Sequence, residues 1–469
     1  MDNKRSILDR WEADRSSLET LHSNRTEDLL AESRQTRDSS VTTANVHDVT
    51  FGTGYSIYSN TIIPAIEAVQ AELILVTCFW ARSRTLDALS GALRKLSAKA
   101  LSNRSSIRVR ICFSSSSLYQ KLFHTTSLQG RLYAPSEWQS KLSLPNASEL
   151  HGLDLEVKSI FVLPFSVMHP KFVILDRKHV YLPSCNISWE DWFEGSVHLS
   201  GPVMEHFINL WQGFWASEAD RVFSLPSGEN DADSRTISTS QAGTLSSLRL
   251  DLNEIPCIFL PSSHHRNPHF SFPWQVCSPP PSTPLNTFLL SALENASKEI
   301  YVQTPNLTSP PVLSALLSAM KRGVHVSIVT SERLMMLEQL LTAGTTTKRC
   351  VRTLTKRYER LLKQRYHAMS DDLESGSVNQ VAILNIKFYQ PDSSPAPGIV
   401  EPVQSHLKLT IIDEELTVLG SGNMDRASWY TSQELGVAFI SRDLASLVRT
   451  QVDLLMSKRC REVYRSMPD

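Results

Sequence analysis

The chain has 469 residues, of which 41% are hydrophobic and 20% are charged, and its formal net charge is −1. This composition is typical of a globular protein and excludes a wholly disordered or fibrous chain. A nearly neutral chain has no overall field that would attract nucleic acid, so such a role would have to rest on a local patch.

Two sequence features indicate the compartment. No hydrophobic run reaches the roughly 18 residues that a membrane span needs, and the first residues lack the apolar stretch of a secretory signal. The seven cysteines are scattered and include no C-x-x-C pair, which is typical of a reduced chain without a disulfide framework. We therefore expect an intracellular protein that is cytoplasmic or peripherally bound to a membrane.

Composition divides the chain into four parts. Residues 1–45 are polar with a weak helical stripe, and we expect a flexible or helical leader there. Residues 46–220 have a globular pattern. Residues 221–284 are rich in Pro and Ser, and we expect a linker and loops. Residues 285–469 form a second globular part.

The two globular parts share an internal repeat, in which residues 60–77 resemble residues 286–303. Each copy predicts a helix, a buried strand, an amphipathic helix and a second strand. The predicted strands cover residues 73–77, 107–113, 300–303 and 324–330. This β-α-β order predicts parallel pairing with right-handed crossovers. The expected fold class is α/β, with two similar domains that each contain a mixed β-sheet flanked by helices.

Each repeat contains the pattern H-x-K-x4-D. Its residues are His169, Lys171 and Asp176 in the first part, and His406, Lys408 and Asp413 in the second. Side chains alternate between the faces of a strand, so the histidine and lysine of each motif would share one face. The aspartate would then fall at the end of the strand.

Further polar residues follow both motifs at matching distances. A serine lies 15 residues and an asparagine 17 residues after each histidine, and a glutamate follows at 25 or 28 residues. These residues are Ser184, Asn186 and Glu194 in the first part, and Ser421, Asn423 and Glu434 in the second. Lysine binds phosphate as a point charge, and serine and asparagine add hydrogen bonds, so the set predicts a phosphate-binding site.

The two imidazoles permit a specific chemistry. One can attack phosphorus as a nucleophile while the other protonates the leaving oxygen. The lysines and asparagines would stabilise the charge that develops on the phosphoryl oxygens. Glu194 and Glu434 are candidates to orient the histidines through their far ring nitrogens. This chemistry requires no metal and no other cofactor.

The paired motifs, with Gly420-Ser421-Gly422-Asn423 after the second, resemble the phospholipase D superfamily. The resemblance implies two domains related by pseudo-twofold symmetry, with the active site at their interface, in a chain that is a monomeric pseudo-dimer. It also implies a phosphohistidine intermediate, with His169 as the nucleophile and His406 as the general acid. One departure is Pro183, where the family prefers glycine. The segment Tyr301-Val-Gln-Thr-Pro-Asn306 is similar to bacterial-type cardiolipin synthases.

The resemblance implies a phospholipase D-type phosphodiesterase or transphosphatidylase that acts on glycerophospholipids, with water or a primary alcohol as acceptor. A cardiolipin-synthase-like phosphatidyl transferase and a metal-independent nuclease of the same superfamily are alternatives. A third is a lipid- or phosphate-binding scaffold that does not use its site. The near-neutral charge and the scarcity of aromatic residues for base stacking near the motifs weigh against the nuclease.

The segment from Lys348 to Arg365 contains eight basic residues and one acidic residue, with apolar residues at helical spacing. This pattern predicts a basic amphipathic helix. It could be a solvated helix face, or it could contact anionic lipid headgroups, where each basic residue contributes about 1 kcal/mol. Peripheral membrane contact through this segment is therefore an open hypothesis.

Overall fold

The computed structural model of the chain describes residues 7, 40–116, 130–162, 166–188, 190–223, 244–263, 279–371, 382–395, 397–398 and 400–466. These residues fall into two compact units. The N-terminal unit holds the described residues within 33–259 and 393–406, and the C-terminal unit holds those within 260–392 and 407–469. Residues 393–406 come from the second half of the sequence and nevertheless belong to the N-terminal unit.

The N-terminal unit alternates strands and helices through most of its length. Its strands are β1 (Val41–Thr53), β2 (Glu72–Phe79), β3 (Ile107–Ser115), β4 (Arg131–Leu132), β5 (Leu153–Ser159), β6 (Phe161–Val162), β7 (Ser166–Val167), β8 (Phe172–Leu175), β9 (His179–Pro183), β10 (Trp192–Ser200), β11 (Thr244–Ser262) and β15 (Gln404–Ser405). Its helices are α2 (Gly54–Ile57), the π-helix η1 (Tyr58–Ile62), α3 (Ile63–Ala68), α4 (Arg84–Ser102), α6 (Pro135–Leu142), the 3₁₀-helix η2 (Ala147–Glu149), α7 (Val203–Phe214) and α8 (Glu218–Arg221).

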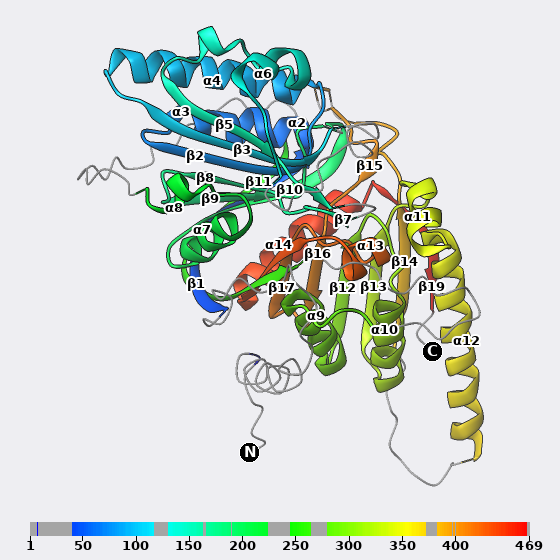
Figure 1. Cartoon of the computed structure of the whole chain (residues 1–469). Helices are drawn as coiled ribbons and strands as arrows, with labels where there is room; N and C mark the ends of the chain where they lie inside the picture. The colour runs from blue at the N-terminus through cyan, green and yellow to red at the C-terminus, as the bar shows by residue number, and fades with distance from the viewer. Residues whose placement is uncertain are drawn as a thin grey trace. The chain divides into compact units, whose positions relative to one another are not determined.

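The C-terminal unit has the same alternating character. Its strands are β12 (Glu299–Thr304), β13 (His325–Thr330), β14 (Leu384–Tyr389), β16 (Leu409–Ile412), β17 (Leu416–Gly420), β18 (Glu434–Ile440) and β19 (Cys460–Arg465). Its helices are α9 (Pro284–Asn295), α10 (Pro310–Arg322), α11 (Met336–Ala343), α12 (Thr347–Asp371), α13 (Arg426–Tyr430) and α14 (Arg442–Met456). In Figure 1, α9 and α10 lie side by side along the sheet.

The two units contain the same order of six central strands. In the N-terminal unit the order is β5-β3-β2-β8-β9-β10, and in the C-terminal unit it is β14-β13-β12-β16-β17-β18. In both, the first three strands are parallel and the following pairs are antiparallel. The predicted α/β class with mixed sheets flanked by helices is therefore confirmed, as is the parallel pairing within each repeat.

Helix α4 illustrates how the sequence produces this packing. Ser83 caps its start by accepting a hydrogen bond from the backbone N–H of Leu86, which satisfies one of the amides left open at a helix N-terminus. Leu86, Leu89, Leu93 and other residues at helical spacing are buried in one cluster with residues of β2 and β3. The apolar stripe of α4 therefore covers one face of the sheet.

The structure differs from the predicted boundaries in the region between the globular parts. Residues 244–262, which were expected to belong to a linker, form the long strand β11. This strand pairs antiparallel with β1, which begins at Val41, inside the predicted leader. Both strands contain many polar residues, so composition alone did not indicate that they are strands that pair with each other. The rest of the leader, apart from residues 7 and 40, and residues 224–243 and 264–278 lie outside the described residues.

Candidate active site

The two histidine–lysine pairs lie immediately before strands β8 and β16. Both strands begin one residue after the lysine, so the prediction that the histidines and lysines are strand residues was wrong. Lys171 is fully buried and donates from Nζ to the backbone carbonyl of His169 at 2.8 Å. Lys408 is also buried, with 4% of its surface exposed. Burying an ammonium group is costly unless an anion or hydrogen bonds compensate it, which suits a site that receives phosphate.

Asp176 and Asp413 lie at the ends of β8 and β16 that are remote from the histidines. Both have positive φ angles, 50° and 55°, a conformation that aspartate tolerates better than most residues. The Asp176 carboxylate accepts from the backbone N–H groups of residues 70–72 at 2.7–2.9 Å. The Asp413 carboxylate accepts from those of residues 297–299 at 2.7–3.0 Å. The structure thus gives both aspartates a backbone-anchoring role at the start of β2 and β12, which differs from the catalytic role expected.

His406 is fixed in the N-terminal unit by a carboxylate of the first repeat. Its Nδ1 lies 2.7 Å from Oε1 of Glu194, and both side chains are at most 3% exposed. Its backbone N–H donates to the carbonyl of Phe193 at 2.8 Å, and β15 pairs in parallel with β10 just before it. A carboxylate on Nδ1 holds a proton there, so Nε2 is the ring nitrogen that would exchange protons in a reaction. The expected orienting role of Glu194 thus fits its contact with the histidine of the second motif.

The two motif serines bind glutamates. The Ser184 hydroxyl donates to Oε2 of Glu194 at 2.5 Å and accepts from the N–H of Gly195 at 2.9 Å. Ser421 repeats the arrangement with Oε2 of Glu434 at 2.5 Å and the N–H of the following residue at 3.0 Å. Both hydroxyls therefore position a carboxylate, whereas the sequence predicted direct binding of phosphate.

The two motif asparagines differ from each other. Oδ1 of Asn186 accepts from the backbone N–H groups of Cys78 and Phe79 at 3.2 and 3.1 Å. Its Nδ2 is buried and makes no hydrogen bond with any residue that the structure describes. A buried donor without a partner is costly, so Asn186 is suited to donate to a phosphoryl oxygen. Asn423 instead donates from Nδ2 to Asp425 at 3.0 Å.

Trp192, whose spacing from the motif favoured a packing role, lies beside the histidine of the second motif. Its ring centroid lies 5.0 Å from that of His406, with the planes inclined by 57°. The indole therefore restricts the imidazole from a second direction. A sequence signal exists, because a tryptophan lies 23 residues after the histidine of each motif, at 192 and 429.

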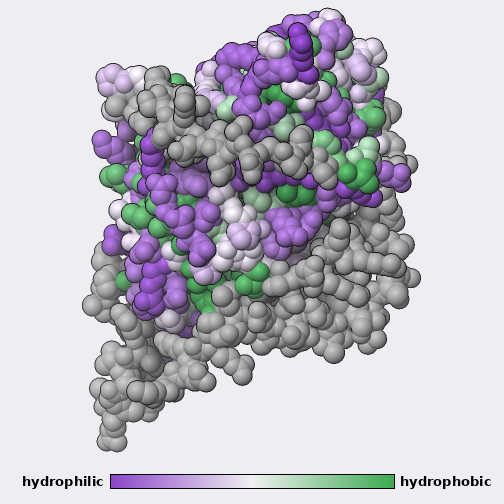
Figure 2. Space-filling model, turned by 90° about the vertical axis from the view of Figure 1, so that its left-hand side faces the viewer, coloured by the Kyte–Doolittle hydropathy of each residue, from purple (hydrophilic) through white to green (hydrophobic). Residues whose placement is uncertain are grey.

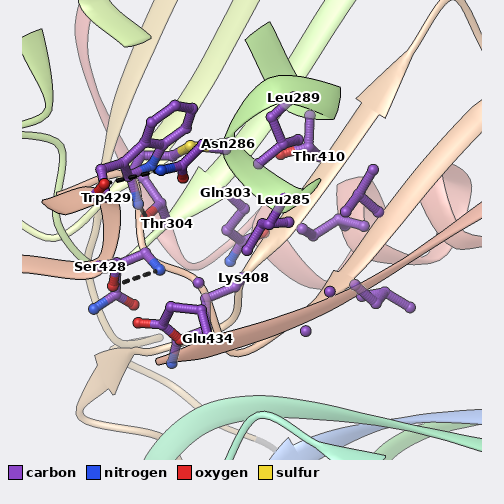
Figure 3. Close-up of a pocket in the computed structure, with 18 residues that line it drawn as sticks. Leu285, Asn286, Leu289, Gln303, Thr304, Lys408, Thr410, Ser428, Trp429 and Glu434 are labelled. Carbon is purple, nitrogen blue, oxygen red and sulfur yellow. Dashed lines mark hydrogen bonds between the residues drawn. The ribbon is translucent and has the colours of Figure 1, made fainter. Parts of the chain in front are cut away.

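A pocket in the C-terminal unit contains the second motif's lysine (Figure 3). Lys408, Asn423 and Glu434 line it together with polar residues of β12 and hydrophobic residues of α9. Gly420 also lines it, and a Cβ atom at this position would lie 2.2 Å from the carbonyl oxygen of Leu435. The close approach of β17 to β18 therefore requires glycine. The structure thus brings together Lys408, Asn423 and Glu434 in one unit and His406, Glu194 and Ser184 in the other.

Comparison with protein families gives a match over residues 289–456 to the family described as cardiolipin synthase, PLD-like domain. This match covers the second motif and most of the residues that line the pocket around Lys408. Residues 289–456 are therefore similar to a phospholipase D-like domain. Comparison with curated protein sequences found no match.

Two solved structures are similar to the chain at low sequence identity. Phosphatidylserine synthase from Haemophilus influenzae Rd KW20 is 13% identical with a TM-score of 0.51, over 88% of this chain and 87% of that one. Nuc from Salmonella typhimurium, a phospholipase D family member, is 21% identical with a TM-score of 0.25, over 39% of this chain and 92% of that one. At these identities the first likeness concerns the fold alone. Among the described residues, no helix combines the length and the hydrophobicity that crossing a bilayer requires.

Proposed function

We propose that the protein is a phospholipase D-type phosphodiesterase or transphosphatidylase that acts on glycerophospholipids through a phosphohistidine intermediate. The observation that carries the proposal is the hydrogen bond between Glu194 and His406, at 2.7 Å and almost fully buried. A histidine held in this way can exchange a proton at Nε2 while the carboxylate stabilises its charged form. The bond also joins the second motif's histidine to the first repeat, which supports the use of both motifs in one reaction.

In the first step, a ring nitrogen of His169 attacks the phosphorus of the substrate. The bond between phosphorus and the headgroup oxygen breaks, and protonated His406 gives its Nε2 proton to that oxygen. The phosphatidyl group remains bound to His169, and His406 is left neutral. Glu194 assists this step because it stabilises His406 in the protonated state that must donate.

In the second step, neutral His406 takes a proton from water or from a primary alcohol. The resulting oxygen attacks phosphorus, and the phosphorus–nitrogen bond to His169 breaks. Water yields phosphatidic acid, and an alcohol yields a new phosphatidyl ester. An acceptor that itself carries a phosphatidyl group would make the reaction the cardiolipin-synthase type. His406 ends protonated and His169 neutral, as at the start.

The negative charge of the phosphoryl oxygens would be stabilised by the two buried lysines and by Asn186. Lys171 and Lys408 supply positive charge at positions from which water is largely excluded, where an electrostatic interaction is stronger than in water. The unsatisfied Nδ2 of Asn186 would donate one hydrogen bond. By analogy with Glu194, we assign to Glu434 the orientation of His169, with Ser421 holding Glu434.

A lipid substrate is supported by the surface of α11, which is exposed on its hydrophobic side. Met336, Leu337, Leu340 and Leu341 are 46%, 72%, 44% and 58% exposed. The residue of α11 that is buried is the polar Gln339, whose Oε1 accepts from the N–H group at the start of α12 at 2.6 Å. Four large apolar residues on one exposed face are unusual for a surface in water alone. By contrast, the face drawn in Figure 2 carries hydrophobic residues scattered among hydrophilic ones.

Helix α12 adds positive charge next to this hydrophobic surface. Only three residues separate it from α11, and both are marked in Figure 1. Its exposed cations are Arg349, Arg352, Lys356, Arg357, Arg360 and Lys363. A protein binds to the surface of an anionic bilayer by inserting apolar side chains and by attracting the lipid charge with cations. The exposed leucines of α11 and the row of cations on α12 provide both. We therefore propose that α11 and α12 form the membrane-contact surface.

The function is tested by headgroup release from vesicles that mix anionic and zwitterionic phospholipids, with a primary alcohol present. We expect release together with a phosphatidyl-alcohol product, and loss of both in His169→Ala and in His406→Ala. His151→Ala is the matched control because this histidine is exposed and outside both motifs. Vesicle binding without any release would indicate the non-enzymatic scaffold. Cleavage of single-stranded DNA or RNA without lipid turnover would indicate the nuclease.

A further inference from the structure

Three histidines meet on one face of the sheet in the N-terminal unit, away from the residues described above. They are His47 on β1, His179 on β9 and His198 on β10. In the pairing of β9 with β10, His179 lies opposite Ser200, two residues from His198. Because alternate residues of a strand share a face, His179 and His198 point to the same side. A register shift between Val46 and Asp48 leaves His47 as an extra residue of β1, and such bulges re-aim side chains.

The ring nitrogens of the three histidines are close enough to bind one ion. One nitrogen from each lies within 4.8 Å of the others. Nε2 of His198 and Nδ1 of His179 are 3.2 Å apart. Two nitrogens bound tetrahedrally to Zn²⁺ at about 2.0–2.1 Å would be separated by about 3.3 Å. The observed spacing is therefore already that of two ligands of a tetrahedral ion.

The groups around the cluster resemble the outer shell of a metal site. Nδ1 of His198 lies 3.1 Å from Oδ2 of Asp48, which directs Nε2 of His198 toward His179. Nε2 of His47 lies 2.8 Å from the hydroxyl of Ser200. A carboxylate on the far nitrogen of a ligating histidine fixes the tautomer and makes the ligand more basic. Each of these contacts therefore orients a ring that could ligate a metal.

We propose that His47, His179 and His198 form a binding site for one divalent transition-metal ion, with water in the fourth position. Three imidazoles in tetrahedral geometry favour Zn²⁺ over Mg²⁺ or Ca²⁺, which prefer oxygen ligands. The ion would join β1 to the consecutive strands β9 and β10, and so would hold β1 in the sheet. Glu194 lies four residues before His198 on β10, about 13 Å away at the rise of a strand, so the metal would not take part in phosphoryl transfer.

The test is metal binding by the full-length, tag-free protein after removal of bound metal with a chelator. Titration with Co²⁺, as a spectroscopic substitute for Zn²⁺, should give the intense visible absorption of tetrahedral Co²⁺ at one equivalent, and Zn²⁺ should displace it. His179→Ala and His198→Ala should each weaken Zn²⁺ binding at least about 100-fold, since each removes one of three ligands. Asp48→Asn should weaken it about 10- to 100-fold, because it removes a partner of a ligand and not a ligand.

Two controls separate this site from unspecific binding and from misfolding. His151→Ala removes an exposed histidine outside the cluster and should leave Co²⁺ binding unchanged. Zn²⁺ should raise the melting temperature of the wild-type protein in a concentration-dependent manner, and this shift should be absent from His198→Ala. Co²⁺ spectra without tetrahedral bands, or equal Zn²⁺ affinity of the wild type and the cluster variants, would overturn the proposal. Because no readout involves lipid turnover, the result is independent of the proposed enzymatic function.

Discussion

Replacing Glu194 with glutamine changes which ring nitrogen of His406 carries a proton. The proposed chemistry depends on the protonation of this ring. The carbonyl oxygen of the glutamine can still accept from Ser184, so the local packing is retained. The amide group would face Nδ1 of His406 and donate to it, where the carboxylate now accepts at 2.7 Å. His406 would then carry its proton on Nε2 as a neutral ring. In this state it is a poor acid for the first step and cannot act as a base in the second.

The size of the effect follows from this change of tautomer. An equivalent exchange in a serine protease triad costs about 10⁴-fold in turnover, and a loss of about 10³- to 10⁴-fold, or about 4–5 kcal/mol in the activation barrier, is expected here. Ser184→Ala leaves the carboxylate in place but removes a 2.5 Å hydrogen bond to it. A hydrogen bond to a charged group contributes about 1.5–3 kcal/mol, so this variant should lose about 10- to 100-fold.

The assay is phosphatidyl-alcohol formation from mixed vesicles, accompanied by ¹⁵N spectra of labelled histidine that report which ring nitrogen carries the proton. The spectra should show protons on both ring nitrogens of resting His406 in the wild type and on Nε2 alone in Glu194→Gln. Glu434→Gln should produce a similar loss of turnover if this residue orients His169. Retention of more than about a tenth of the activity by Glu194→Gln, with its melting temperature unchanged, would refute the reasoning, since a tautomer exchange costs far more.

Four further outcomes follow from the structure. Asp413→Ala removes the acceptor of several backbone N–H groups at the start of β12 and should destabilise the fold by about 2 kcal/mol, lowering the melting temperature by about 5 °C. Gly420→Ala would place a Cβ atom 2.2 Å from the carbonyl oxygen of Leu435. It should lower the free energy of unfolding, measured with urea, by at least about 2 kcal/mol. Its control, Gly91→Ala in α4, has no atom within 4 Å of the new Cβ and should stabilise by about 0.5–1 kcal/mol. Burial alone would raise the pKa of Asp220, but a backbone N–H group and two arginines lower it from 3.8 to about 2. The ionised carboxylate therefore stabilises the folded protein above pH 4. This contribution of about 2 kcal/mol to the free energy of unfolding should be lost as the pH falls from about 4 to about 2. Urea unfolding of Asp220→Asn in this range should lack that part of the decline. Leu337→Glu should reduce sedimentation with anionic vesicles without affecting the melting temperature, since the side chain is 72% exposed, and unchanged sedimentation would contradict a role of α11 in membrane contact.

The parts of the fold that depend on local pattern could be predicted from the sequence. Strands β2, β3, β12 and β13 are rich in buried apolar residues, and helix α4 has a regular leucine stripe, so the sequence pattern located them and their parallel pairing. The duplicated spacing of the histidines, lysines, serines and asparagines carried the resemblance to the phospholipase D superfamily, because such offsets reflect equal positions in two similar sheets.

The remaining features depend on contacts between residues far apart in the sequence. The polar strand β11 is stabilised by pairing with β1 and not by an apolar pattern of its own. The anchoring role of Asp176 depends on amides about 105 residues away in the chain, and the partner of Glu194 is a histidine 212 residues away. The cluster of His47, His179 and His198 likewise forms only when three strands pair.

The central claim is that His169 carries the phosphatidyl group between the two steps. It is tested most directly by rapid quenching of the reaction with a radiolabelled phospholipid, followed by mapping of the acid-labile, base-stable label on the chain. The account predicts a label on His169 in the wild type, its absence in His169→Ala, and its accumulation in a variant that slows the second step. A label on His406 would reverse the assigned roles, and vigorous turnover by His169→Ala with no label in the wild type would contradict the covalent mechanism.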